Sequence, residues 1–168
     1  KQEIGKYAAQ LIKKDDFVYL DAGSSVDLMI DYIAEQEAIY VTNAIGHAQK
    51  LLQKGCRVFL LGGELKEVTE AIVGAQAIDS LKRYNFTKGF FGANGVHRER
   101  GLTTPDITEA LVKEKAMEQC ANRYVLADST KINQISSVTF AGFEEGMILT
   151  TRLRDASYKA CKNILEVG

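Results

Sequence analysis

The sequence predicts an α/β fold, a mostly parallel Rossmann-like sheet with helices on both faces. Short apolar runs alternate with segments whose apolar residues recur every three or four positions, patterns typical of buried parallel strands and amphipathic helices. Polar or glycine-rich residues repeatedly follow a run and precede a helical segment, as in a doubly wound sheet. The length of 168 residues suits one domain, so we expect a single domain over residues 1–168.

The first half of the chain predicts alternating helices and strands, as an α/β fold requires. Ile4, Ala8 and Ile12 have helical spacing, and the apolar run at 17–20 is typical of a buried strand. The pattern then predicts, in order, a helix ending near residue 33, a strand at 38–41, a helix at 45–53 and a strand at 57–61. Residues 69–73 fit a short strand or the start of a helix, and the strand is favoured because Gly74 follows; a helix at 75–83 comes next.

The second half continues the alternation with shorter strands. The pattern predicts a strand at 87–91, a polar loop at 96–105, a helix from about residue 106, a strand at 124–127, short strands at 138–141 and 147–150, and a final helix at 153–165.

Composition excludes several classes of function. The chain has 21 Lys and Arg against 22 Asp and Glu, so it lacks the basic surface of a DNA-coating protein. No apolar run approaches the roughly 18 residues of a membrane span, and we expect no membrane partner. The widely spaced Cys56, Cys120 and Cys161 predict free thiols in the cytoplasm. His47 and His97 lack metal-ligand spacing, and no nucleotide fingerprint occurs, so we expect neither metal nor cofactor.

The loop after the first predicted strand is the most informative. Gly23 permits a tight turn, and Ser24 and Ser25 place hydroxyls beside the free amides of a helix start, which suits a phosphate. Asp21 is positioned to accept hydrogen bonds from sugar hydroxyls. The alternative for the two serines is that one of them only caps the helix.

Other candidates follow later strands or lie on one helix, and parallel strands bring such loops to one sheet edge. They are Thr42, Asn43, Gly62, Gly63, Gly92, Asn94, Gly95, Glu109, Lys113, Asp128 and Lys131. Each has a plainer alternative: a helix cap for the Thr–Asn pair, a chain turn for the glycines, a solvated ion pair for the two helical residues, and mutual pairing for the last two.

Read in order, these loops resemble the sensor domain of the DeoR-type sugar-operon repressors. The resemblance covers nearly the whole chain and rests on residues 21–25, 41–43, 61–63, 73–74, 90–95, 109–113 and 127–131. It implies a domain that senses a phosphorylated sugar and has no catalytic residues. It also implies a winged helix-turn-helix before Lys1 that binds operator DNA, and assembly into a homodimer or homotetramer.

Within that family, residues 83–95 and 103–106 look most like fructose-operon repressors of Gram-positive bacteria, which implies fructose 1-phosphate as effector. A lactose-type repressor that senses tagatose 6-phosphate would look similar. For the phosphate we expect Ser24, Ser25 and Lys131, with backbone amides around Gly23 and in residues 92–95. For the sugar hydroxyls we expect Asp21, Asn43, Glu109, Asp128 and Lys113.

The fold implied by this resemblance is similar to that of ribose-5-phosphate isomerase, which defines an enzymatic alternative. Glu114 matches the base of the isomerase pattern, but the three acids of its first segment, at residues 91–95 here, and the lysine of its glycine-rich turn are missing. Isomerisation needs a base and a group that stabilises the enediolate, and the second requirement fails. We therefore expect binding rather than turnover. The alternatives are an isomerase that uses Glu114 and an oligomerisation module that binds no small molecule.

Overall fold

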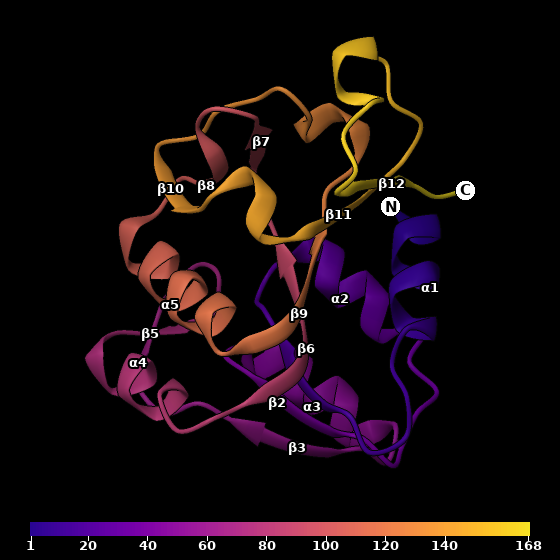
Figure 1. Ribbon diagram of the computed structural model, residues 1–168. Helices are drawn as coiled ribbons and strands as arrows, with labels where there is room; N and C mark the ends of the chain where they lie inside the picture. Colours follow the sequence, from indigo (N-terminus) through magenta and orange to yellow (C-terminus); the bar gives the residue numbers. More distant parts are fainter.

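A seven-stranded parallel sheet forms the centre of the protein, for which a computed structural model describes all residues from 1 to 168 (Figure 1). Its strands are β1 (Phe17–Leu20), β2 (Ile39–Thr42), β3 (Arg57–Leu60), β6 (Phe86–Gly92), β9 (Cys120–Leu126), β11 (Met147–Thr150) and β12 (Ile164–Glu166). Their order is β12-β11-β9-β6-β1-β2-β3, and every neighbouring pair is parallel. The chain therefore winds in one direction from β1 to β3 and in the other from β6 onward, so the switch point lies between β1 and β6.

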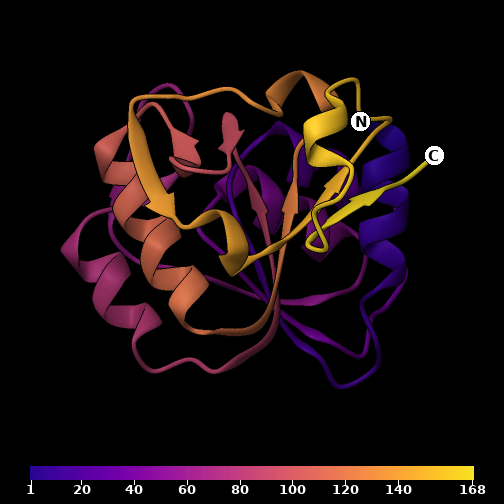
Figure 2. The same cartoon turned by 45° about the horizontal axis from the view of Figure 1, so that its top comes forward.

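Helices cover both faces of this sheet, as predicted (Figure 2). They are α1 (Gln2–Gln10), α2 (Ser24–Ile30), α3 (Ile45–Gln53), α4 (Ala75–Leu81) and α5 (Ile107–Glu118). The first three share a buried cluster with Val18 and Leu20 of β1, whereas α4 and α5 share the other cluster with Tyr19. Because side chains alternate along a strand, one short apolar run supplies both cores.

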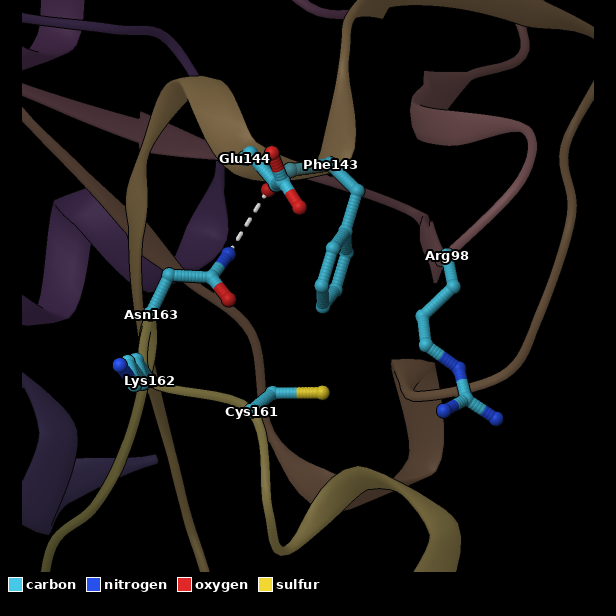
Figure 3. Close-up of a pocket in the computed structure, with 6 residues that line it drawn as sticks. All are labelled: Arg98, Phe143, Glu144, Cys161, Lys162 and Asn163. Carbon is cyan, nitrogen blue, oxygen red and sulfur yellow. Dashed lines mark hydrogen bonds between the residues drawn. The ribbon is translucent and has the colours of Figure 1, made fainter.

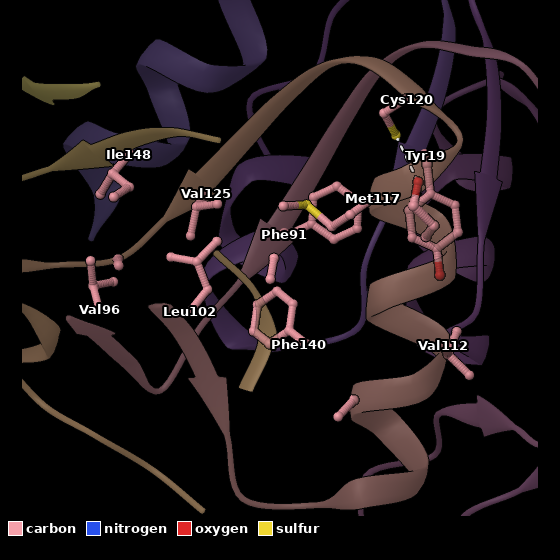
Figure 4. Close-up of a cluster of buried hydrophobic side chains, with 14 of the residues drawn as sticks. Tyr19, Phe91, Val96, Leu102, Val112, Met117, Cys120, Val125, Phe140 and Ile148 are labelled. Carbon is pink, nitrogen blue, oxygen red and sulfur yellow. Dashed lines mark hydrogen bonds between the residues drawn. The ribbon is translucent and has the colours of Figure 1, made fainter. Parts of the chain in front are cut away.

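The core beneath α5 fixes this helix against the sheet (Figure 4). The rings of Tyr19 and Phe91 stack with their centroids 5.6 Å apart, and Val112 and Met117 of α5 are buried in the same cluster. Cys120 also lies here, and burial raises the pKa of its thiol to about 12. This packing determines which side of α5 faces the carboxyl edge of β1 and β6.

Two predicted segments have a different structure. The expected polar loop at 96–105 contains an antiparallel hairpin of β7 (Gly95–His97) and β8 (Gly101–Thr104), joined by β10 (Val138–Ala141) in a small sheet. Val96 and Leu102 are fully buried in this hairpin, but the polar residues between them hide the strand pattern. The predicted helix at 153–165 is wrong, because the segment forms a short 3-10 turn at Ala156–Tyr158 and then β12.

The predicted strand at 69–73 is shorter than expected. Only β5 (Ile72–Val73) is extended, and it pairs antiparallel with β4 (Glu64–Leu65) in a separate hairpin. Glu70 in the connection adopts a positive φ of 57°. This hairpin brings Thr69 and Glu70 to the carboxyl edge of the main sheet, where they line cavities described below. No helix in the structure has both the length and the apolar character needed to cross a membrane.

Candidate functional site

The loops after β1 and β6 meet α5 at the carboxyl edge of the sheet, around a cavity of about 270 Å³. We call it the lysine cavity, because three lysine side chains are among its lining residues. The lining consists of Lys1, Ala22, Gly23, Ser24, Ser25, Thr69, Gly92, Ala93, Asn94, Thr104, Pro105, Glu109, Lys113 and Lys131. It therefore brings together eight of the predicted site residues from four separate loops or helices, at the switch point where open α/β sheets bind ligands.

A second cavity of about 390 Å³ adjoins the first. We call it the carboxylate cavity, because Asp27, Glu70 and Glu109 are the charged carboxylates in its lining. The complete lining is Ala22, Gly23, Ser24, Asp27, Ala44, Gly46, His47, Thr69, Glu70 and Glu109. The loop after β1 forms part of both cavities, so a ligand on this loop has access to two chemically different surroundings.

The loop after β1 has the form expected of an anion site. Gly23 takes a φ of 135° and occupies the position before α2, where a residue without a side chain leaves the first amides of the helix uncapped. Ser24 and Ser25 are already helical, so neither is the cap residue that the alternative interpretation required. Lys1 Nζ donates to Ser24 Oγ at 3.3 Å. Hydroxyls, free amides and an ammonium group thus converge on one wall.

Asp21 and Lys113 form a buried ion pair beneath the lysine cavity. Their side chains are 2% and 8% exposed. The Gly92 amide donates to Asp21 Oδ2 at 3.1 Å, and Lys113 Nζ donates to the Gly92 carbonyl at 2.9 Å. Lys113 Nζ also lies 5.1 Å from the centroid of the Phe140 ring. Asp21 therefore lies outside the cavity lining. Lys113 pairs with Asp21 and not with Glu109, so the solvated Glu109–Lys113 pair of the alternative interpretation does not form.

Thr42 and Asn43 support the site from below instead of lining it. The Thr42 hydroxyl donates to the Leu20 carbonyl at 2.6 Å. Asn43 is 2% exposed, and its amide group donates to the Ile72 carbonyl at 3.1 Å while accepting from the Ala22 amide at 3.1 Å. Neither side chain acts as the ordinary helix cap. Asn43 instead joins the first loop of the site to the β4–β5 hairpin.

Asn43→Ala is expected to destabilise the protein by about 1–3 kcal/mol, since it leaves two backbone groups without their partner. Urea unfolding of the variant checks this value. Asn133→Ala is the matched control, because Asn133 hydrogen-bonds the Tyr158 hydroxyl outside the site. Ligand affinity is expected to fall in Asn43→Ala only, and a fall in both variants would contradict the positioning role of Asn43.

Four further candidates lie outside both cavities: Gly62, Gly63, Gly95 and Asp128. Gly63 has a φ of 148°, and a Cβ there would lie 2.7 Å from the Val73 carbonyl oxygen, so close packing on the hairpin explains this glycine. Gly95 is likewise packed on the Gln134 backbone. Asp128 caps the 3-10 turn Ser129–Lys131 by accepting from the Thr130 amide at 2.9 Å, which helps to place Lys131 at the cavity.

The contacts of Lys66 with helix α5 are not predicted by the sequence. This lysine extends from the β4–β5 hairpin to Asp106, the N-cap of α5, and to Glu109, whose Oε2 is 3.1 Å from Lys66 Nζ. Lys66 and the Thr108 hydroxyl hold the pKa of Asp106 well below its usual range. Lys66 lies 43 residues from Glu109, so no local pattern points to this contact. The lining residues Lys1, Thr69 and Thr104 were missed for the same reason.

A separate cavity of about 450 Å³ lies beside the C-terminal segment and shares no residue with the other two (Figure 3). Arg98 and Lys162 give it two cations, and Cys161 is part of its lining. Asn163 Nδ2 donates to the Phe143 carbonyl at 2.8 Å in this region. This cavity contains no predicted site residue and lies away from the loops after β1 and β6. No group of three or more His, Cys, Asp or Glu side chains is placed to hold a metal.

The proteins similar to this chain in sequence include transcriptional regulators and repressors. A family model described as the DeoR C terminal sensor domain matches residues 1–152. The uncharacterized HTH-type transcriptional regulator FruR of Bacillus subtilis (strain 168) is 41% identical over 159 residues, covering 94% of this chain and 63% of that protein. The lactose phosphotransferase system repressor of Staphylococcus aureus (strain NCTC 8325 / PS 47) is 31% identical over 148 residues, covering 86% and 59%. The chain thus spans about three fifths of these relatives.

Solved structures show the same fold in other proteins. Ribose 5-phosphate isomerase A from Methanocaldococcus jannaschii has a TM-score of 0.57 at 15% identity, covering 78% of this chain and 52% of that chain. The Pyrococcus horikoshii OT3 translation initiation factor eIF-2B has a TM-score of 0.57 at 15% identity, covering 81% and 48%. Glu114, the base of the isomerase alternative, is exposed and outside both sheet-edge cavities. Both relatives are named as a transcriptional regulator or a repressor and not as enzymes. The chain belongs to the family of DeoR C-terminal sensor domains.

Proposed function

We propose that this domain binds a phosphorylated sugar, with fructose 1-phosphate as the effector, and thereby controls the affinity of a repressor for operator DNA. The observation that carries the proposal is the lysine cavity, where serine hydroxyls, free backbone amides and lysine ammonium groups converge at the switch point of the sheet. The similarity to FruR supports the choice of sugar.

The phosphate is proposed to lie between the loop after β1 and Lys131. Ser24 and Ser25 supply hydroxyls and amides to its oxygens, and the ammonium groups of Lys131 and Lys1 supply compensating charge. Charge-assisted hydrogen bonds of this kind are roughly twice as strong as neutral ones, which favours a phosphorylated sugar over its parent sugar.

The sugar is proposed to contact Asn94 and Glu109, which line the same cavity. The Asn94 amide group donates and accepts hydrogen bonds and the Glu109 carboxylate accepts them, so both suit sugar hydroxyls. Tagatose 6-phosphate is the second candidate effector, because the lactose phosphotransferase system repressors are also similar to this chain.

The effector is proposed to act in the cytoplasm by shifting an equilibrium between two arrangements of a dimer or tetramer. A helix-turn-helix outside this chain would contact the operator, as the HTH-type name of the FruR relative suggests. The effector changes operator affinity only by as much as its own affinity differs between the two arrangements.

Thermal unfolding against sugar phosphates and their parent sugars tests the proposal. A ligand at a hundred times its Kd stabilises the folded state by about 2.7 kcal/mol. For a domain of this size the melting temperature is expected to rise by roughly 5–10 °C. We expect that rise with fructose 1-phosphate and none with fructose.

The panel includes tagatose 6-phosphate, glucose 6-phosphate and inorganic phosphate. A rise with tagatose 6-phosphate alone would replace the proposed effector and keep the phosphate site. No rise with any sugar phosphate would contradict ligand sensing and favour an oligomerisation module.

A further inference from the structure

We propose that the sugar of the bound effector extends from Asn94 and Glu109 into the carboxylate cavity, where His47 forms a hydrogen bond with a sugar hydroxyl. The inference rests on the proposed function and adds two points to it: the direction in which the effector binds, and a residue that selects it. His47 lies in the first turn of α3, after the buried Thr42 that ends β2 and the buried Asn43 that follows it.

The two adjoining cavities differ sharply in charge. Lysine side chains dominate the charged lining of the lysine cavity, whereas the carboxylate cavity is lined by Asp27, Glu70 and Glu109 without any Lys or Arg. A phosphate dianion is repelled by neighbouring carboxylates, but sugar hydroxyls donate hydrogen bonds to them. A phosphorylated sugar that spans the shared wall at Gly23 and Ser24 therefore places its phosphate toward the lysines and its hydroxyls toward the acids.

His47 contributes to the lining of the carboxylate cavity an imidazole ring whose Nε2 has no hydrogen-bond partner within the protein. Its imidazole lines the cavity, its side chain is 8% exposed, and its Nε2 is buried without a hydrogen-bond partner. Its Nδ1 lies 3.6 Å from Asp27 Oδ1, beyond ordinary hydrogen-bond distance. Buried polar nitrogens without partners are rare because leaving them unpaired is costly. A sugar hydroxyl, which both donates and accepts, satisfies this nitrogen in either tautomer of the ring.

The charge state of His47 suits a neutral ligand group. Burial lowers the pKa of the imidazole below its ordinary value, although the carboxylates of Asp27 and Asp21 act in the opposite direction. The ring is therefore mainly neutral near pH 7 and offers no cation to a phosphate. This agrees with the direction of binding derived from the lining charges.

Imidazole ¹H–¹⁵N NMR of the unmodified chain tests the contact directly. The sequence contains two histidines, so His97 serves as an internal control. The His97 Nδ1 already accepts from the amides of Glu99 at 3.1 Å and Arg100 at 3.2 Å, and His97 lines neither sheet-edge cavity. We expect fructose 1-phosphate to move the His47 Nε2 resonance, inorganic phosphate to leave it in place, and neither to move His97.

Variants separate recognition from a structural effect. His47→Phe is expected to weaken binding of fructose 1-phosphate roughly threefold to tenfold, the value of one lost hydrogen bond, and to leave inorganic phosphate binding unchanged. His47→Gln keeps a donor and an acceptor and is expected to restore part of the loss. Lys50→Gln is the matched control. Lys50 lies on the same helix as His47 but lines neither cavity, and its Nζ is 3.1 Å from Asp27 Oδ1.

Two results would overturn the inference while leaving the proposed function intact. One is binding of fructose 1-phosphate with no movement of the His47 resonance. The other is an equal loss of sugar phosphate and inorganic phosphate affinity in His47→Phe, which would indicate general damage to the site. If fructose 1-phosphate failed to raise the melting temperature of the unmodified chain, the proposed effector would fail first, and this inference with it.

Discussion

Lys113→Met is expected to destabilise this domain by about 3–5 kcal/mol, because it leaves the carboxylate of Asp21 buried without a counter-charge. Asp21 is 2% exposed and has only the Gly92 amide, at 3.1 Å, as a remaining hydrogen-bond donor. The methionine keeps most of the volume of the lysine stem, so the loss reports the removal of the ammonium group, which lies 5.1 Å from the centroid of the Phe140 ring.

The melting temperature is the measurement, and it is expected to fall by roughly 6–20 °C for a domain of this size. Lys115→Met on the same helix is the control. Lys115 pairs with Glu118 at 2.9 Å near the surface, where such pairs contribute about 0–1 kcal/mol. Combining Asp21→Asn with Lys113→Met removes both charges and is expected to recover much of the stability. A loss below about 1 kcal/mol in Lys113→Met would contradict a desolvated pair.

Ser25→Glu is expected to lower the affinity for a sugar phosphate by at least about a hundredfold, or about 2.7 kcal/mol, by placing a carboxylate beside the phosphate. The same substitution is expected to change folding stability by less than about 0.5 kcal/mol, since an acidic side chain in the first turn of a helix is favourable. Titration calorimetry and thermal unfolding together separate these two effects.

Ser80→Glu provides the same change of charge on α4, outside both sheet-edge cavities. It is expected to bind the sugar phosphate like the unmodified chain. If Ser25→Glu retained the original affinity, the phosphate would have to lie elsewhere, and the cavity with Arg98 and Lys162 would become the leading alternative.

The sequence predicts the parallel sheet well because its signals are local. The run at 17–20 alternates between the two cores, with Tyr19 on one face and Val18 and Leu20 on the other. The small sheet was missed because Val96 and Leu102, both fully buried, are separated by the polar turn of their hairpin. The segment at 153–165 has apolar residues at helical spacing, yet Ile164 pairs with Ile148 of β11 instead. Tertiary pairing there outweighs local periodicity.

The sequence predicts where the candidate site lies, but not the side-chain contacts that hold it together. Strand ends at Asp21 and Gly92 were identifiable because polar residues follow apolar runs, and parallel strands bring their ends to one edge. The pairing of Asp21 with Lys113 joins residues 92 apart in sequence, and the contact of Lys66 with Glu109 depends on a hairpin that local pattern does not reveal. Such contacts are set by packing of the elements, so only the structure separates residues that line the cavity from those that support it.

A crystal structure of the domain with fructose 1-phosphate would test the central claim most directly. Phosphate density is expected between Ser24, Ser25 and Lys131, with the sugar extending past Gly23 toward the carboxylate cavity. Density for the phosphate beside Arg98 and Lys162, with the sheet edge empty, would contradict that claim.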